Sequence, residues 1–172
     1  IENYSILKEK LIQKNYKFYS ETDTEVIVNL ISYYYNNYNC VEKTIKKVIT
    51  LLEGTWGIVL VCLDTPNTLY CFRNGSPILI GNNEKECLIV SEESGFCNRL
   101  NNYFVLDNND ICIVKNSDSK IKITTTNIYK LNARQNNNLT LTPDPYKHWM
   151  IKEIFEQTET INRVIKYGSR IH

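Results

Sequence analysis

Thiols and imidazoles are the side chains with which this sequence could carry out nucleophilic catalysis. Both of its histidines, His148 and His172, lie near the C-terminus. Its six cysteines are Cys40, Cys62, Cys71, Cys87, Cys97 and Cys112. They lack the CxxC or CxxxC spacing of zinc fingers and ribbons, so we expect no structural metal site. No Ser or Cys forms a recognisable triad with His, and Cys40 and Cys97, which look least buried, have no activating neighbours.

Asp23 is a carboxylate at the junction between a short extended segment and a predicted helix. An anion at a helix N-terminus contributes roughly 0.3–1 kcal/mol by interacting with the helix dipole. The same carboxylate could bind a substrate ammonium group, because charge-assisted hydrogen bonds are among the stronger polar contacts. From the residues alone, the role at the helix terminus is the stronger interpretation.

Two glycine-containing segments could hold a phosphate or shape a site. Residues 54–57 (Gly-Thr-Trp-Gly) precede a predicted strand, whereas a phosphate-binding loop follows a strand and opens a helix. Residues 73–76 (Arg-Asn-Gly-Ser) form a predicted turn in which Gly75 supplies unusual backbone angles. We therefore expect Arg73 and Ser76 to have a structural role. His148 is expected to pack or cap at the start of the last helix.

The elements that must position these residues follow from the hydrophobic pattern. Helical spacing predicts helices over residues 5–12, 23–35, 41–53 and 148–166. Ser5 is a candidate N-cap, and Thr22 with Glu25 has the spacing of a capping box. Brief alternation predicts a short strand at 16–19.

A run of strands separates the third helix from the last one. Strands are predicted at 54–63, 68–72, 77–81, 87–90, 103–106, 111–114 and 120–123, and a short helix or turn at 92–100. The β-branched run at 54–63 is typical of a strand covered on both faces, and the last three strands are expected to form a meander. Residues 131–145 read as a connector. Helices segregated from a mostly antiparallel sheet indicate an α+β domain.

Composition limits the classes of function. The chain has 172 residues, 42% of them hydrophobic and 23% charged, with a net charge of +1. This is a globular composition, and it lacks the charge that would attract nucleic acid or an anionic membrane. No apolar run approaches the ~20 residues of a transmembrane helix. Cysteines within strand-like segments fit reduced, buried thiols in a cytoplasmic protein.

Five blocks of sequence occur in a distinctive order, at residues 1–4, 20–27, 54–57, 73–81 and 148–157. In this order they resemble the glutaminase domain of glutamine–fructose-6-phosphate aminotransferases over essentially the whole chain. The Arg-x-Gly-Ser-Pro turn recurs loosely among amidotransferases. The pattern His-x-Met-x-Lys-Glu-Ile-x-Glu-Gln at 148–157 is much more specific. Glu92 departs from the resemblance, because the family more usually has Ser-Asp where this chain has Ser91-Glu92.

The resemblance implies a four-layer αββα sandwich of the N-terminal nucleophile amidotransferase type, incomplete at its N-terminus. Residues 1–145 would be the greater, C-terminal part of the glutaminase domain. Residues 146–172 would be the terminal helix and linker towards a sugar isomerase domain. The family's nucleophile, a Cys whose own α-amine acts as base, and its Asn-Gly oxyanion pair would both precede Ile1. This chain alone is therefore expected to be inactive.

The resemblance also implies the partners. Asp23 matches the carboxylate that binds the α-ammonium of glutamine, and beside its neighbours at 20–27 this role becomes the favoured one. The full enzyme would release ammonia from glutamine and pass it to fructose 6-phosphate, forming glucosamine 6-phosphate. It would need no cofactor and would be a homo-oligomer. Two alternatives remain open: another class II glutamine amidotransferase, and a catalytically dead paralogue kept as a scaffold.

Overall fold

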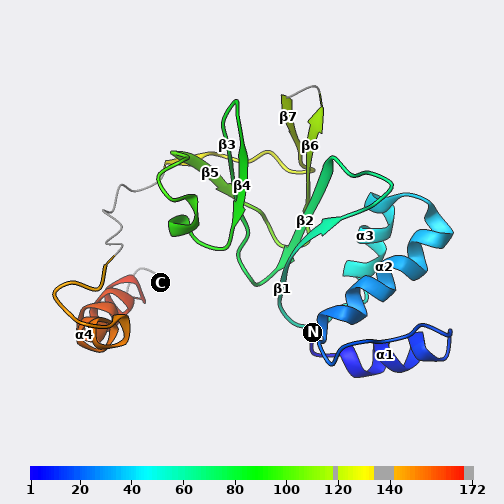
Figure 1. Cartoon of the computed structure of the whole chain (residues 1–172), viewed down its shortest axis with the longest axis horizontal. Helices are drawn as coiled ribbons and strands as arrows, with labels where there is room; N and C mark the ends of the chain where they lie inside the picture. The colour runs from blue at the N-terminus through cyan, green and yellow to red at the C-terminus, as the bar shows by residue number, and fades with distance from the viewer. Residues whose placement is uncertain (118–119, 134–141, 169–172) are drawn as a thin grey trace. The chain divides into compact units, whose positions relative to one another are not determined.

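The computed structural model describes residues 1–117, 120–133 and 142–168, the last six of these by their backbone alone. Two compact units divide the chain, Ile1–Arg134 and Gln135–His172 (Figure 1). Among the described residues, the first unit contains three helices, a 3-10 turn and eight strands, and the second contains one helix. No helix within the described ranges is both long and apolar enough to cross a bilayer.

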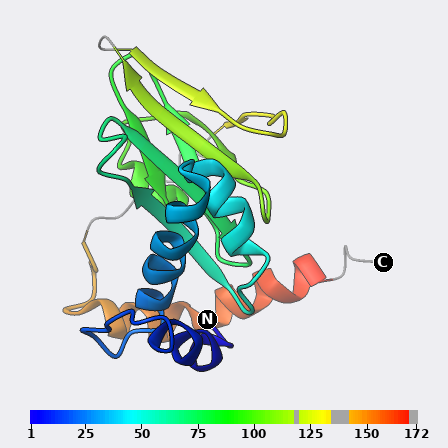
Figure 2. The same cartoon turned by 90° about the vertical axis from the view of Figure 1, so that its right-hand side faces the viewer.

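Three helices form the first layer of the larger unit. They are α1 (Tyr4–Ile12), α2 (Thr24–Tyr38) and α3 (Val41–Ile49). In α3 the predicted apolar stripe is buried at Val41, Ile45 and Val48. In α1 only Leu7 and Leu11 are buried, whereas Ile6 and Ile12 are exposed. Figure 2 shows α2 and α3 lying across one face of the first sheet. A single core joins this face to the helices.

Two antiparallel four-stranded sheets follow. The first has the order β1-β2-β6-β7 and the second β4-β3-β5-β8. The strands are β1 (Trp56–Val61), β2 (Thr68–Asn74), β3 (Leu79–Asn82), β4 (Cys87–Val90), β5 (Asn102–Val105), β6 (Ile111–Ser117), β7 (Lys120–Thr124) and β8 (Asn132–Ala133). Every pairing between them is antiparallel.

Side-chain alternation along the strands builds three successive hydrophobic layers. In β2, Phe72 packs against the helices, whereas Cys71 faces the second sheet. In β3, Ile80 points towards the first sheet, and Leu79 points outwards to Phe96 of the 3-10 turn η1 (Glu93–Phe96). Because successive side chains along a strand face opposite sides of the sheet, β2 and β3 each contribute to a hydrophobic layer on either face of their sheet. The described unit thus stacks helices, sheet, sheet and a short helical turn.

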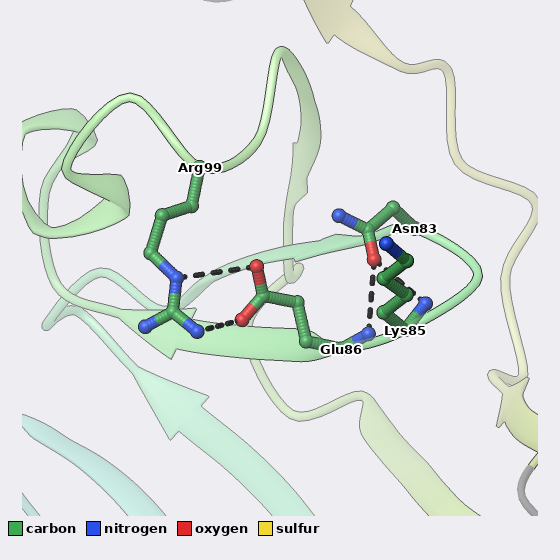
Figure 3. Close-up of polar contacts among 4 residues, drawn as sticks. All are labelled: Asn83, Lys85, Glu86 and Arg99. Carbon is green, nitrogen blue, oxygen red and sulfur yellow. Dashed lines mark hydrogen bonds and ion pairs between the residues drawn. The ribbon is translucent and has the colours of Figure 1, made fainter.

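The β3–β4 hairpin is tied to the loop that follows η1 (Figure 3). The side-chain oxygen of Asn83 accepts the backbone N–H groups of Lys85 and Glu86 at 2.8 and 2.9 Å. This turn presents the Glu86 carboxylate to Arg99, whose Nε donates at 3.2 Å and whose Nη2 makes a second bond. The two bonds are parallel, and such a bidentate pair fixes orientation more than it adds stability at an exposed site.

Three local predictions about the helices are wrong. Residues 16–19 form no strand, because Tyr16 packs edge-on against Tyr33 and Phe18 lies under Lys8. Asn3, rather than Ser5, is the N-cap of α1. The Thr22–Glu25 capping box does not form, since Glu25 accepts N–H groups from Tyr19 and Ser20.

Two predictions about the strands also need correction. The expected meander is wrong: β6 pairs with β7, but β5 belongs to the other sheet, where it pairs with β3 and β8. The β1 strand is also shorter than residues 54–63 and has buried or half-buried residues alternating with exposed ones. Its Val59 and Val61 are exposed, so it is not covered on both faces as its neighbours are.

The smaller unit contains α4 (Trp149–Gly168). His148 precedes this helix, and its carbonyl accepts the Lys152 N–H at 3.3 Å. The predicted apolar stripe is exposed at Met150, Ile154 and Phe155, although the Phe155 ring stacks on Tyr146. His172 lies outside the described residues. The predicted domain boundary at residue 145 stays a prediction.

We expect Asp110→Asn to lower the free energy of unfolding by about 1–2 kcal/mol. Asp110 is buried and accepts hydrogen bonds from the Tyr129 hydroxyl (2.6 Å) and the Ile111 N–H (2.8 Å). Asn offers a single acceptor oxygen, so one of these donors would meet an amide NH₂ group. Urea unfolding of the chain followed by circular dichroism measures the difference.

The loss of unfolding free energy caused by Asp110→Asn should depend on pH. Burial acts to raise the pKa of Asp110, but the hydrogen bonds from Tyr129 and Ile111 outweigh it and hold the pKa below its usual value. A carboxylate with a depressed native pKa stabilises the fold above its unfolded pKa and loses that effect as the pH falls through the native value. The gap between wild type and Asp110→Asn should therefore narrow below about pH 4. Asp107→Asn, a more exposed change in the same turn, is the matched control, and equal losses for both variants would contradict this account.

Candidate active-site end of the first sheet

Asp23 lies immediately before α2, as its N-cap, and its side chain is 41% exposed. The carboxylate makes no hydrogen bond that caps the helix. Its Oδ2 instead lies within hydrogen-bonding distance of the backbone nitrogen of Ile1. The carboxylate is therefore not used to cap α2, and it lies beside the segment at residues 1–3.

The backbone in front of Asp23 is held by Glu25. Its carboxylate accepts the N–H groups of Tyr19 and Ser20, both at 2.8 Å, and the Ser20 hydroxyl at 2.6 Å. These bonds lower the pKa of Glu25, chiefly through Ser20. These hydrogen bonds join the loop at Tyr19 and Ser20 to α2, and they thereby fix the position of Asp23, which lies between the loop and the helix.

A second set of contacts fixes the chain segment that reaches Asp23. The Glu2 N–H donates to the Glu53 carbonyl at 2.8 Å. Asn3 uses both ends of its amide, donating to the Leu51 carbonyl at 2.9 Å and accepting the Glu53 N–H at 3.1 Å. These bonds join residues about fifty apart in sequence, so residues 1–3 are tied to the segment that enters β1.

The Arg73–Ser76 turn meets the same segment. Asn74 donates from its side chain to the Gly54 carbonyl at 2.7 Å, and Arg73 Nη1 donates to the Ser76 carbonyl at 3.1 Å. Gly75 has φ +75°, and a Cβ placed there would lie 2.6 Å from Thr55 Cγ2. The side chains of Arg73 and Asn74 bond to backbone carbonyls, as expected of a turn with a structural role. Asp23 and the blocks at 1–4, 54–57 and 73–76 are thus linked around the entrance to β1.

Two buried nitrogen atoms at this end of the sheet have no hydrogen-bond partner within the described part of the chain. They are Trp56 Nε1 and Arg73 Nε. Trp56 is a residue of the hydrophobic core between the helices and the first sheet. An unpaired buried donor is uncommon and carries a desolvation penalty.

The thiols do not form a nucleophilic centre. Cys71 and Cys112 face each other across β2 and β6, with Cys87 in the same core. Burial raises the pKa of Cys71 to about 12 and that of Cys87 to about 11, and it also raises the pKa of Cys112. Cys97 is exposed, and its Sγ lies 3.6 Å from the Ser94 carbonyl. All six cysteines are free thiols, as expected.

Several residues of the site were not predicted from the sequence. Asn3, Asn74 and Asn108 supply side-chain amides that connect its segments, and Asn108 accepts the Gly75 N–H at 3.0 Å. Asparagine is abundant in this chain, so residue type gave no signal. Glu92 accepts the hydroxyl of Ser94 at the start of η1 and so has a local role. Among the described residues, no three acidic, Cys or His side chains gather as metal ligands would.

A family model described as a glutamine amidotransferase domain matches residues 1–98. These residues include Asp23, the segment at residues 1–3 and the Arg73–Ser76 turn. Because the match covers more than half of the sequence, the chain belongs to the glutamine amidotransferase domain family. The resemblance seen in the sequence is thereby confirmed.

The chain is also similar to curated proteins over nearly its whole length. The probable glutamine–fructose-6-phosphate aminotransferase (isomerizing) of Acanthamoeba polyphaga mimivirus is 38% identical over 96% of the chain. The enzymes of that name from Buchnera aphidicola and Thermococcus kodakarensis are 37% and 32% identical, over 96% and 99% of the chain. The chain spans only 27%, 28% and 29% of these three proteins, respectively.

A solved structure supports the fold class. The glutamine phosphoribosylpyrophosphate amidotransferase of B. subtilis covers 71% of the chain with a TM-score of 0.58 and 21% identity, and the chain covers 26% of it. At this identity the likeness concerns the fold alone. It confirms the predicted α+β sandwich of the N-terminal nucleophile amidotransferase type.

Proposed function

We propose that this chain is the glutamine-binding part of a glutamine–fructose-6-phosphate aminotransferase. The observation that carries the proposal is a half-exposed carboxylate, Asp23, that does not cap its helix and lies within the region that matches the amidotransferase family. Glutamine presents an α-ammonium group, which pairs well with such a carboxylate. The similarity to the named aminotransferases extends over 96% of the chain, well beyond residue 98, which favours them over other class II amidotransferases.

Asp23 would bind the α-ammonium of glutamine and so orient its side-chain amide towards the nucleophile. A carboxylate that is already ionised and held by a fixed loop binds an ammonium without first losing a proton. The full reaction would release ammonia from glutamine and transfer it to fructose 6-phosphate, yielding glutamate and glucosamine 6-phosphate. The acceptor sugar and a homo-oligomeric assembly are parts of this proposal.

The thiols support a cytoplasmic location for the protein. Cys71 and Cys112 lie directly opposite each other on neighbouring strands and are not joined. Paired cysteines in such positions persist as thiols in reducing compartments.

The purified 172-residue chain should release no ammonia from glutamine. Thiol catalysis requires a thiol that is readily deprotonated. Burial instead raises the pKa of the Cys71, Cys87 and Cys112 thiols. A coupled glutamate dehydrogenase assay measures ammonia, with size-exclusion chromatography confirming that the sample is not aggregated. Ammonia production above a buffer control would contradict the prediction.

The protein encoded by the complete reading frame separates the proposed function from its two alternatives. Supplied with glutamine and fructose 6-phosphate, it should form glucosamine 6-phosphate, detected by mass spectrometry. Ammonia release without this product would indicate a different class II amidotransferase. Absence of both products would favour a scaffolding paralogue.

A further inference from the structure

A small cavity lies between α1 and α2 in the larger unit, with the end of the α3 segment as its third wall. Its volume is about 130 Å³. The lining residues are Leu7, Lys10, Leu11, Lys14, Leu30, Tyr33, Tyr34 and Leu51. Neither Asp23 nor any of the cysteines contributes a side chain to it.

The cavity has an apolar floor and a cationic rim. Leu7, Leu11 and Leu30 are buried in the helical core and form the floor. Lys10 in the last turn of α1 and Lys14 in the turn just after the helix are both exposed and both line the cavity. The Lys14 Nζ lies 4.8 Å from the centroid of the Tyr33 ring, so that ring and charge are adjacent at the opening. No lining residue is acidic, and the site therefore favours a ligand with a negative charge.

The size of the cavity limits what can enter. An engineered apolar cavity of about 150 Å³ in another protein binds benzene. Interiors are otherwise packed with few voids larger than a water molecule, so an apolar space of this size is available to a guest. A single ring would fill the floor of the cavity, and a carboxylate attached to it would reach the two lysines.

We propose that this cavity is a binding site for a compact aryl carboxylate. The ring packs on the three leucines and against Tyr33 and Tyr34, and the carboxylate lies between Lys10 and Lys14. Ligand binding would join α1 to α2. Burial of the ring provides most of the affinity, and the exposed lysines provide selectivity for an anion over a neutral molecule of the same shape.

Isothermal titration of the complete protein with benzoate and with benzamide tests the proposal. The two probes share ring and size but differ in charge. We expect one benzoate per chain, bound about fivefold more tightly than benzamide. Lys10→Gln/Lys14→Gln should abolish this preference while leaving benzamide binding unchanged. The matched control, Lys8→Gln/Lys17→Gln, makes the same change of net charge outside the cavity and should behave as wild type.

A cavity-filling variant tests the location independently of charge. Leu7→Trp places a larger ring in the space and should abolish binding of both probes. Unchanged glutamine-dependent activity would show that the variant is folded. Three results would overturn the proposal: no benzoate binding at about 10 mM, equal affinities for the two probes in wild type, or benzoate binding that survives Leu7→Trp.

Discussion

Replacing Asp23 by Asn in the complete protein should reduce kcat/KM for glutamine by about ten- to a hundred-fold. The reason is the loss of one charge-assisted hydrogen bond, which is worth about 1.5–3 kcal/mol, between a carboxylate and the α-ammonium of the substrate. Activity with free ammonia, which bypasses glutamine, should stay nearly intact. Steady-state kinetics with glutamine and with ammonium chloride measure both effects on the same sample.

Glu21→Gln is the matched control for this experiment. Glu21 is exposed and lies two residues from Asp23 in the same loop, so its replacement removes a nearby charge without touching the proposed contact. It should change kcat/KM for glutamine less than twofold, as expected of a screened surface charge. An Asp23→Asn enzyme with unchanged glutamine kinetics would contradict the assignment of Asp23.

Gly75→Ala should destabilise the fold by about 2–4 kcal/mol, because two penalties act together. Gly75 has φ +75°, a region that is strained for residues with a side chain. Its added Cβ would also lie 2.6 Å from Thr55 Cγ2 and 3.0 Å from Thr55 Cβ. The β-branched Thr55 side chain has little freedom to move away. Urea denaturation monitored by circular dichroism measures the change.

Gly57→Ala is the matched control, because it adds the same Cβ to another glycine at the same end of the first sheet. Its added Cβ would make ordinary contacts, the nearest at 3.4 Å to Ile78, and the backbone there has no positive φ. We expect a change below about 1 kcal/mol. Similar losses for the two variants would show that the turn does not impose the strain described here.

The periodicity of hydrophobic residues predicted most helices and strands, because an element that buries one face repeats its apolar residues at a regular spacing. The α3 stripe of Val41, Ile45 and Val48 is buried as its spacing of three and four residues requires. The segment 16–19 misled, since alternation does not supply a neighbouring strand, and its rings pack on a helix instead. The order of strands was also beyond local pattern: period two describes β5 and β6 equally well, but they belong to different sheets.

The candidate site was only partly predictable for a similar reason. Asp23 was found through resemblance to a family, since an acidic residue before a helix is common. The segment beside it lies 22 residues away, and Asn3 bonds residues about fifty positions distant. Such contacts depend on the tertiary packing of the chain, which no local pattern encodes. The Gly75 turn was predictable because its chemistry is contained in adjacent residues.

A structure of the complete protein bound to glutamate, the product of glutamine hydrolysis, would show whether Asp23 binds the ammonium group of the substrate. We expect the α-ammonium of glutamate to lie within hydrogen-bonding distance of an Asp23 carboxylate oxygen, about 2.7–2.9 Å. Glutamate bound with its ammonium on another carboxylate, and Asp23 facing solvent, would contradict it.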